Sequence, residues 1–587
     1  MREPDDLNIA DLRDRAVAAA RGDAAFDLLI AGAVVADMAT GELRAADVGI
    51  CGAMIASVHA PKSRNDAVQI IDAERKVLTP GLIDMHMHIE SSMITPEEYV
   101  AYILPRGVTT LVWDPHEFGN VAGIAGVDYA LKCAAASPMR ILPLAPSCVP
   151  SAPGYEMAGA DFGPDIIEDL LHRDGIAGLA EVMDMAAVVG RSDRMRGIVQ
   201  LALASSKMVG GHARGLNGPS LQAYAAAGIG SDHELTSAAD LLEKLRAGLT
   251  IELRGSHDHL LPEFAIALQA LPQMPSTVTF CTDDIFPDDL LKDGALDHVV
   301  RRMVQLGLDP MRALLAVTLN AAIRLGRRDL GLVAPGKRAD LVLFNDLSGL
   351  EATTVIRNGV PVGQDFPTPR IPQAFLQTCA LRPVKPNDFK VPAQGPVARI
   401  ATIDQPRFTQ WGEARVQVQS GYIVPPDDTT LIAVIHRHGK APVKPRVGFL
   451  RGWGKWRGAF ATTISHDSHN LTVFGSDPAD MATAANALIE RGGGMAVVKQ
   501  GKVIAVLPLP IAGLVSDRPL AEAAATFQLV RAAMAQVVDW APPYLVFKSL
   551  VGATLACNAG PHQTDMGIAD PLAGRLLASP ILADGLT

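Results

Sequence analysis

Two histidines, His86 and His88, stand one residue apart near the end of the apolar segment 82–88. Side chains at positions i and i+2 of a β-strand point to the same face, so both imidazoles can reach one metal ion. A protein metal site needs three or more ligands, which should follow other strands of the same sheet. Further ligand candidates occur later in the chain at Glu181, His212, His233 and Asp283.

Apolar segments of strand length alternate with longer Ala- and Leu-rich helical segments between residues 79 and 329. This alternation predicts a metal-binding parallel (β/α)8 barrel, whose active site lies at the carboxyl ends of the strands. Polar residues follow each predicted strand, so their side chains should meet at one rim. The predicted strands are 82–88, 109–114, 141–145, 176–182, 208–212, 228–232, 250–253 and 277–281.

The segments on either side of this barrel contain short β-rich stretches separated by turn residues. Residues 26–78 and 330–368 are predicted to form one composite β-sandwich domain into which the barrel is inserted. Residues 1–25 are predicted to form a helical lead-in, and 369–587 a C-terminal α+β domain. The proline spacing at 383–396 suggests an extended linker. The predicted fold class is therefore α/β, with a TIM-like barrel at its centre.

The chain has 587 residues, of which 49% are hydrophobic, and a net charge of -11. This acidic balance argues against nucleic acid or an anionic membrane as partner, because both select basic surfaces. Six scattered cysteines without a CxxC pair indicate a reducing cytoplasm. Neither a signal peptide nor an apolar run of membrane-spanning length is recognisable. We expect a cytoplasmic protein with a small-molecule partner.

The candidate ligands also have simpler interpretations. A single histidine on an apolar strand is usually a buried, hydrogen-bonded residue, but ligand candidates after several strands make a metal site the better interpretation. Imidazole with carboxylate suits Mn²⁺, Fe²⁺ or Zn²⁺, and an acid-rich rim suits two ions. His257 and His259 are interpreted as loop residues outside the ligand set. Cys281 is interpreted as a small buried apolar residue.

Two polar clusters could be functional or merely structural. The segment Asp114-Pro115-His116-Glu117 could be a solvated loop, but its position at the rim favours a catalytic role. The segment 465–470 could be an ordinary capping or turn cluster, or it could cover the barrel mouth.

Several motifs together resemble the bacterial adenine deaminases of the amidohydrolase superfamily. The resemblance covers nearly the whole chain, including C-terminal segments that other amidohydrolases lack. The barrel motifs are 80–93, 114–117, 147–150 and 180–183, and the C-terminal ones are 465–470, the glycine run 492–494 and 507–514.

This resemblance implies a two-metal site and a hydrolytic deamination. His86, His88 and Asp283 would hold one ion, His212 and His233 the other, and Glu181 would bridge them. The ions would activate a bridging water whose hydroxide attacks C6 of adenine, giving hypoxanthine and ammonia. Asp283 would take the proton of the water, and a second acid would protonate N1. The candidates for that acid are Asp114, His116, Glu117 and Glu234.

Two rim positions depart from the family pattern. Arg214 stands where relatives have proline, and Ile285 where many have arginine. Arg214 is therefore predicted to order Asp284 or Asp288, or to donate to a purine nitrogen. The candidate substrate-binding residues are Ser147, Glu234, Asp284, Arg214 and His466. A homodimer is common among relatives and is expected here.

Two alternatives share the scaffold. A metal-dependent hydrolase of a cyclic amide or ureide would be expected to carry a bridging lysine on the fourth strand, where Glu181 stands. A non-catalytic scaffold protein would be expected to have lost metal ligands, whereas every expected ligand position is occupied.

Overall fold

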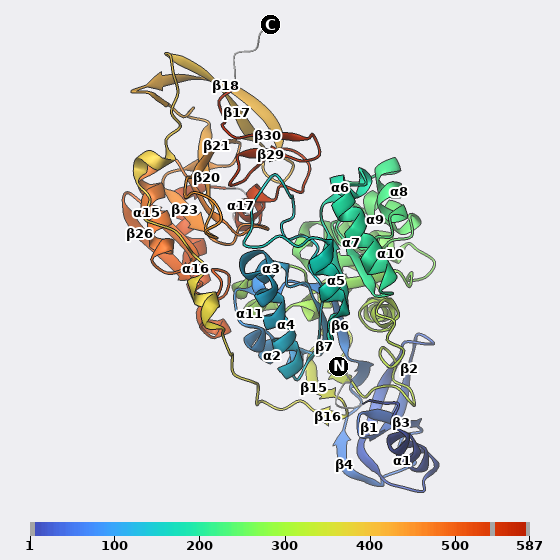
Figure 1. Cartoon of the computed structure of the whole chain (residues 1–587). Coiled ribbons are helices and arrows are strands. Elements are labelled where there is room, and N and C mark those ends of the chain that lie inside the picture. Colours follow the sequence, from blue (N-terminus) through green and yellow to red (C-terminus); the bar gives the residue numbers. More distant parts are fainter. Residues whose placement is uncertain (1–5, 541–545, 583–587) are drawn as a thin grey trace.

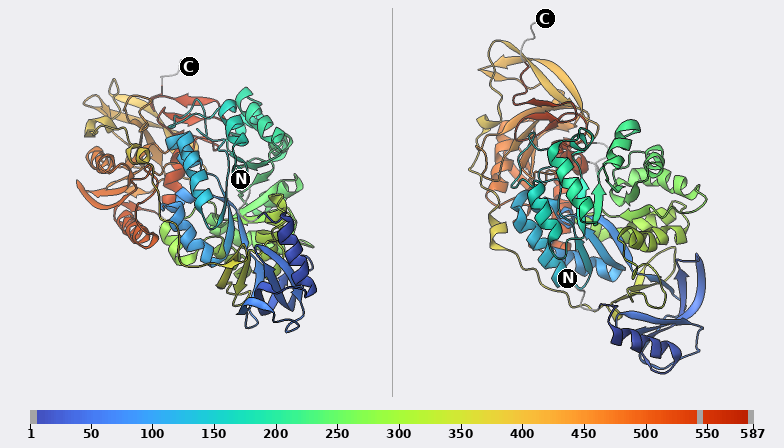
Figure 2. Two further views of the ribbon diagram at one scale, coloured as in Figure 1. Left: turned by 60° about the horizontal axis from the view of Figure 1, so that its bottom comes forward. Right: turned by 45° about the vertical axis from the view of Figure 1, so that its right-hand side comes forward.

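The computed structural model describes residues 6–540 and 546–582 (Figure 1). Figure 1 shows a small β-sheet region at one end, a barrel in the middle and a second α/β region at the other end. The two further views in Figure 2 keep the C-terminal region beside the barrel and away from the N-terminal sheet.

The predicted barrel is confirmed, and each predicted strand overlaps an observed one. The strands pair in parallel as β6-β7-β8, β9-β10 and β11-β12-β13. Parallel bridges join β8 to β9 (Ala145 to Leu179) and the end of β13 to β6 (Met87 to Asp283), and the Gly230 N–H, just before β11, donates to the Val209 carbonyl of β10. The strands are β6 (Leu82–Met87), β7 (Val108–Trp113), β8 (Arg140–Pro143), β9 (Gly178–Val182), β10 (Met208–Gly211), β11 (Ser231–Asp232), β12 (Thr250–Arg254) and β13 (Val278–Cys281).

Helices surround the barrel, and several begin at residues that cap them. The side chains of Thr95, Ser192 and Ser237 each accept a backbone N–H from the first turn that follows. The helices are α2 (Pro96–Ile103), α3 (His116–Ala122), α4 (Ile124–Ala136), α5 (Pro164–His172), α6 (Met185–Val189), α7 (Asp193–Ala204), α8 (Gly218–Ala226), α9 (Ala238–Arg246), α10 (Leu261–Gln269), α11 (Pro287–Asp293), α12 (Leu296–Gln305), α13 (Pro310–Leu315) and α14 (Ala321–Arg324), with a 3-10 helix at Gly255–Leu260.

The two β-rich segments flanking the barrel form one hydrogen-bonded sheet. Its strand order is β16-β15-β14-β5-β1-β2-β3, with β4 also paired to β1. The two segments meet where β5 runs antiparallel to β14. Helix α1 (Ala10–Arg21) packs Ala16 and Ala19 into the same core as Phe26 of β1, so the predicted lead-in is part of this region. The strands are β1 (Phe26–Asp37), β2 (Glu42–Cys51), β3 (Met54–His59), β4 (Ala67–Asp72), β5 (Val77–Pro80), β14 (Leu341–Phe344), β15 (Ala352–Arg357) and β16 (Val360–Pro361).

The predicted linker at 383–396 is wrong. Val384, Phe389 and Val391 are buried in the core of the C-terminal region, so this proline-rich segment is packed. The segment that leaves the composite sheet is instead 363–370, which lacks helix and strand and is largely exposed. Proline spacing alone could not distinguish an extended linker from an extended segment that lies on a core.

The C-terminal region is built on a sheet of order β19-β18-β17-β21-β20-β24-β23-β25-β26. Neighbouring residues of β23 face opposite sides: Ala461 packs toward α15, whereas Phe460 joins the large core that includes barrel residues. The strands are β17 (Val397–Asp404), β18 (Gln410–Gln419), β19 (Tyr422–Ile423), β20 (Thr429–Ile435), β21 (Arg446–Arg451), β22 (Lys455–Trp456), β23 (Ala459–Thr462), β24 (Leu471–Gly475), β25 (Gly494–Lys499), β26 (Lys502–Pro508), β27 (Val538–Asp539), β28 (His562–Gln563), β29 (Ile568–Asp570) and β30 (Arg575–Leu577), and the helices are α15 (Pro478–Ile489), α16 (Leu520–Val537) and α17 (Val546–Val551).

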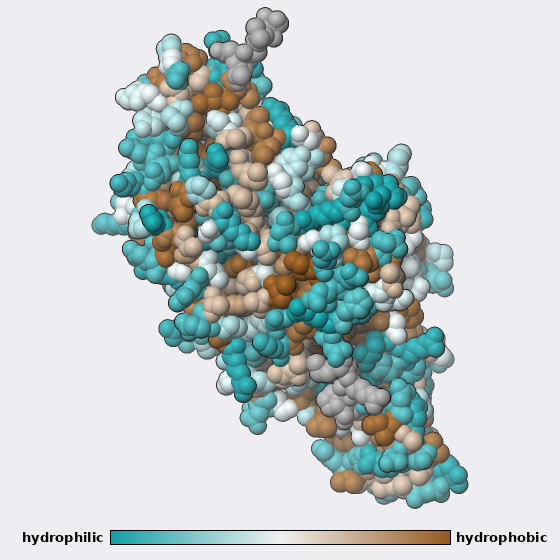
Figure 3. All heavy atoms as spheres, viewed as in Figure 1, coloured by the Kyte–Doolittle hydropathy of each residue, from teal (hydrophilic) through white to brown (hydrophobic). Residues whose placement is uncertain are grey.

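Across residues 6–540 and 546–582, the helices are too short or too polar to cross a bilayer. All six cysteines are free, as expected from their scattered positions. Hydrophilic residues cover most of the face seen in Figure 3, with smaller hydrophobic areas between them.

Candidate metal centre

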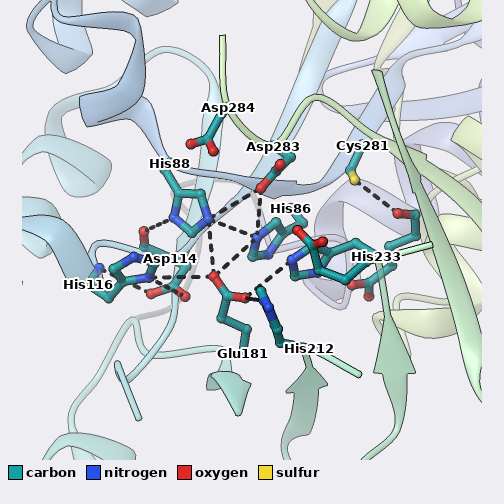
Figure 4. Close-up of polar contacts among 12 residues, drawn as sticks. His86, His88, Asp114, His116, Glu181, His212, His233, Cys281, Asp283 and Asp284 are labelled. Atoms are coloured by element: carbon teal, nitrogen blue, oxygen red, sulfur yellow. Dashed lines mark hydrogen bonds and ion pairs between the residues drawn. The ribbon is translucent and has the colours of Figure 1, made fainter. Parts of the chain in front are cut away.

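The six predicted metal ligands converge at the carboxyl ends of the barrel strands (Figure 4). They come from or directly follow β6, β9, β10, β11 and β13, and each is at most 3% exposed. The barrel brings them together because parallel strands end at the same rim. These residues are His86, His88, Glu181, His212, His233 and Asp283.

Three ligand atoms form a triangle of the size that one metal ion requires. The Nε2 atoms of His86 and His88 lie 3.0 Å apart, and Asp283 Oδ1 lies 3.4 Å from each. Two ligands bound tetrahedrally at about 2.0–2.1 Å lie about 3.4 Å apart, so the triangle fits an ion at its centre.

Glu181 lies between this triangle and the second pair of histidines. Its Oε1 is 3.3 Å from His88 Nε2, whereas its Oε2 is 2.7 Å from His212 Nδ1 and 3.2 Å from His233 Nε2. Burial alone would raise the pKa of Glu181, but the surrounding histidines outweigh burial and hold the pKa well below its usual value. An ionised carboxylate with one oxygen toward each set of histidines fits a bridge between two cations.

Asp283 is held in an unusual backbone conformation at this site. Its φ is 60°, in the left-handed region that non-glycine residues seldom adopt. The backbone N–H of Asp283 donates to the His86 carbonyl at 2.9 Å, which ties β13 to β6. Burial raises the pKa of Asp283, but the charge of Arg254 and contacts with His86 and His88 lower it well below its usual value.

The segment after β7 contributes one residue to the cavity wall. His116 Nδ1 lies 3.0 Å from Asp114 Oδ2 and His116 Nε2 lies 3.6 Å from Asp467 Oδ1. Among the residues of this segment, His116 lines the cavity beside the ligands, whereas Asp114 and Glu117 lie behind the wall. Burial raises the pKa of Glu117 to about 8.

The polar cluster at 465–470 reaches the barrel from the C-terminal region. His466 and Asp467 line the same cavity, and their Nδ1 and Oδ1 atoms lie 3.3 Å apart. His466 Nδ1 is also 3.9 Å from Glu117 Oε1. Asp467 was missed in the sequence because nothing in the cluster distinguishes it from its polar neighbours.

Arg214 lines the cavity, as a purine contact requires, but it pairs with neither Asp284 nor Asp288 within the described residues. Its Nη1 contacts Glu234 Oε2 at 2.5 Å, and Asp288 pairs with Arg531 of α16 at 2.7 Å instead. Arg254 also contacts Glu234, and it contacts Asp283 as well. Arg254 ends β12, so the rule that strand ends carry the site could have identified it.

Ser147 and the histidines after β12 also differ from expectation. Ser147 is 1% exposed, its hydroxyl donates to the Glu181 carbonyl at 2.6 Å, and it is not among the residues that line the cavity. This position supports the backbone of β9 rather than contact with substrate. His257 and His259 lie in the 3-10 segment at Gly255–Leu260, which is kinked at His257, and both line the cavity.

Comparisons with known proteins identify the family. Residues 77–362 match the amidohydrolase family, and residues 406–573 match the adenine deaminase C-terminal domain. Adenine deaminase 2 of Rhizobium meliloti is 61% identical over 99% of both chains. Adenine deaminase of Klebsiella pneumoniae subsp. pneumoniae is 50% identical over 98% of this chain and 96% of its own. This chain belongs to the adenine deaminase family.

Proposed function

We propose that this enzyme deaminates adenine hydrolytically to hypoxanthine and ammonia at a two-metal centre. The observation that carries the proposal is the position of Glu181, with one oxygen toward His88 and the other toward His212 and His233. The relatives named above, all adenine deaminases, support adenine as the substrate. Two bound divalent ions would supply an activated water at neutral pH and stabilise developing negative charge.

The protein's own residues would divide the remaining work. His86, His88 and Asp283 would hold one ion, and His212 and His233 the other. Asp283 would also take a proton from the attacking water, because its Oδ1 is one corner of the ligand triangle and so lies beside the ion that would hold the water.

His116 is the best placed of the four candidate acids. It lines the cavity, and its Nε2 has no hydrogen-bond partner within the described part of the chain. The carboxylate of Asp114 accepts a hydrogen bond from the other ring nitrogen, His116 Nδ1, and so orients the imidazole. Glu234 also lines the cavity, but both of its oxygens are held by arginines. We therefore assign to His116 Nε2 the proton for N1 of the purine.

The remaining assignments concern binding and assembly. His466, Glu234, Arg214 and Asp284 line the cavity and are the candidates for contact with the purine. Mn²⁺ or Fe²⁺, with Zn²⁺ as the further candidate, suits the imidazole and carboxylate ligands. The homodimer and the cytoplasmic location stay predictions from the sequence.

One assay tests the function against its two alternatives. The protein is depleted of metal, reloaded with manganese or ferrous iron, and assayed for ammonia release from adenine and for ring opening of a cyclic amide. We expect ammonia from adenine alone. Ring opening without deamination would identify a cyclic amide hydrolase, and inactivity on both substrates with two metals bound would identify a scaffold.

A further inference from the structure

The cavity at the barrel mouth extends beyond the metal centre toward the C-terminal region. Its volume is about 640 Å³, within the range of about 300–1,000 Å³ that encloses drug-sized ligands. A lone purine base is smaller than such ligands. We call the part lined by Arg214, Arg254, His257, Arg407 and Lys548 the outer chamber.

Two cations of the outer chamber share one carboxylate. Arg214 and Arg254 both contact Glu234, and Arg254 also contacts Asp283, whose other oxygen faces the metal ligands. Asp284 Oδ2 lies 3.8 Å from Arg254, but Glu234 is shared by both guanidinium groups and Asp283 also faces the candidate metal ligands.

The C-terminal region adds two more cations. Arg407 Nη2 lies 3.3 Å from His259 Nε2, and Lys548 Nζ donates to the Ser256 carbonyl at 2.7 Å. Neither forms an ion pair with a carboxylate within residues 6–540 and 546–582. Burial and the charges of Arg214 and Arg254 lower the pKa of Arg407, so these like charges lie close together.

A buried imidazole nitrogen beside these cations also lacks a partner. His257 is 9% exposed, lines the outer chamber, and its Nδ1 has no hydrogen-bond partner in the described part of the chain. Buried polar atoms are normally paired, and gathered like charges are normally balanced. One anion in the outer chamber would satisfy both requirements.

We propose that the outer chamber binds a phosphate group, either free inorganic phosphate or the phosphate of a purine nucleotide whose base occupies the inner cavity. Guanidinium groups match phosphate oxygens in geometry and form strong charge-assisted hydrogen bonds with them. Adenine is uncharged and gives these cations no partner. The inference depends on the cavity and its charges, and not on the deamination.

Isothermal titration calorimetry of the manganese-loaded full-length protein tests the proposal. The probes are adenosine monophosphate, adenosine and inorganic phosphate. We expect adenosine monophosphate to bind at least about tenfold more tightly than adenosine if the chamber takes a nucleotide phosphate. If the chamber takes free phosphate, inorganic phosphate binds by itself, and adenosine monophosphate and adenosine bind with similar affinity.

Variants separate the outer chamber from the metal ions, which could also attract phosphate. The double variant Arg407→Gln and Lys548→Gln should abolish the tenfold preference or the phosphate binding. The charge-preserving variant Arg407→Lys should keep most of the tenfold preference or of the phosphate binding. Lys455→Gln, an exposed lysine of β22 that does not line the cavity, is the matched control and should behave as the wild type.

Two results would overturn the proposal. The first is a wild-type protein that binds the two purines equally and does not bind phosphate. The second is phosphate binding, or a preference for the nucleotide, that is unchanged in the double variant, because the metal ions would then hold the anion. Circular dichroism of each variant verifies that a lost preference does not come from misfolding.

Discussion

Replacing Glu181 by glutamine removes the one charge that lies between the two sets of histidines. Glutamine keeps the shape of the side chain, so the change isolates the charge. At an effective dielectric constant of about 20, two unit charges 3.3 Å apart, the distance from Glu181 Oε1 to His88 Nε2, interact by about 5 kcal/mol. A doubly charged ion would lose at least this much attraction. A loss of about 4 kcal/mol already weakens binding about 1,000-fold.

We therefore expect Glu181→Gln to bind fewer than two metal ions per chain and to lose at least about 100-fold in adenine turnover. Metal content is measured by inductively coupled plasma mass spectrometry after desalting, alongside ammonia release. Glu156→Gln is the matched control. Burial raises the pKa of Glu156 to about 8, so this carboxyl group is mostly uncharged at pH 7 and its replacement removes little charge.

The outcome of this experiment can contradict the bridging role in two ways. Two bound ions with near-normal deamination would show that Glu181 does not bridge. Two bound ions with lost activity would assign Glu181 to proton transfer, and the bridge would have to be sought among Asp114, Glu117 and Asp284.

Three further variants test the surroundings of the site. Arg254→Gln should reduce turnover about 10-fold to 100-fold, and more than Arg214→Gln does, because Arg254 contacts Asp283 and, among the carboxylates of the described residues, Arg214 contacts only Glu234; steady-state kinetics with metal analysis will measure this. Asp467→Asn should keep both ions yet lower turnover or raise the Michaelis constant by about tenfold or more, because it faces His116 from the C-terminal region; unchanged kinetics would refute the role. Burial raises the pKa of Asp340, but the charges of Arg140 and Arg357 outweigh burial and lower the pKa below 3.8. The ionised Asp340 therefore stabilises the fold above about pH 4. This contribution is lost as the pH falls through the lowered pKa. Asp340→Asn should thus lower stability by roughly 3–5 kcal/mol at pH 7 and by less at pH 2–3, as measured by urea unfolding.

The barrel and the convergence of the candidate metal ligands could be predicted from sequence because both depend on local patterns. The alternation of strands and helices gives the barrel, and the barrel rule places every strand end at one rim. The spacing of His86 and His88 needs only the two-residue period of a strand. The arginine at position 214, where relatives have proline, could be recognised as a change in a motif. Its ion-pair partner could not be predicted. That partner, Glu234, follows a different strand and was known only as a rim acid.

The contacts across the two regions could not be predicted, since they depend on how one folded surface meets another. Arg531 pairs with Asp288 from 243 residues away, and no spacing rule relates the two positions. Asp467 reaches His116 only because β23 and β24 carry the polar segment between them to the barrel mouth. All six candidate metal ligands therefore come from the barrel alone, whereas the shape and charge of the rest of the cavity need both regions. For this reason changes at Asp467, Arg407 or Lys548 should alter what the cavity holds while the six ligands stay in place.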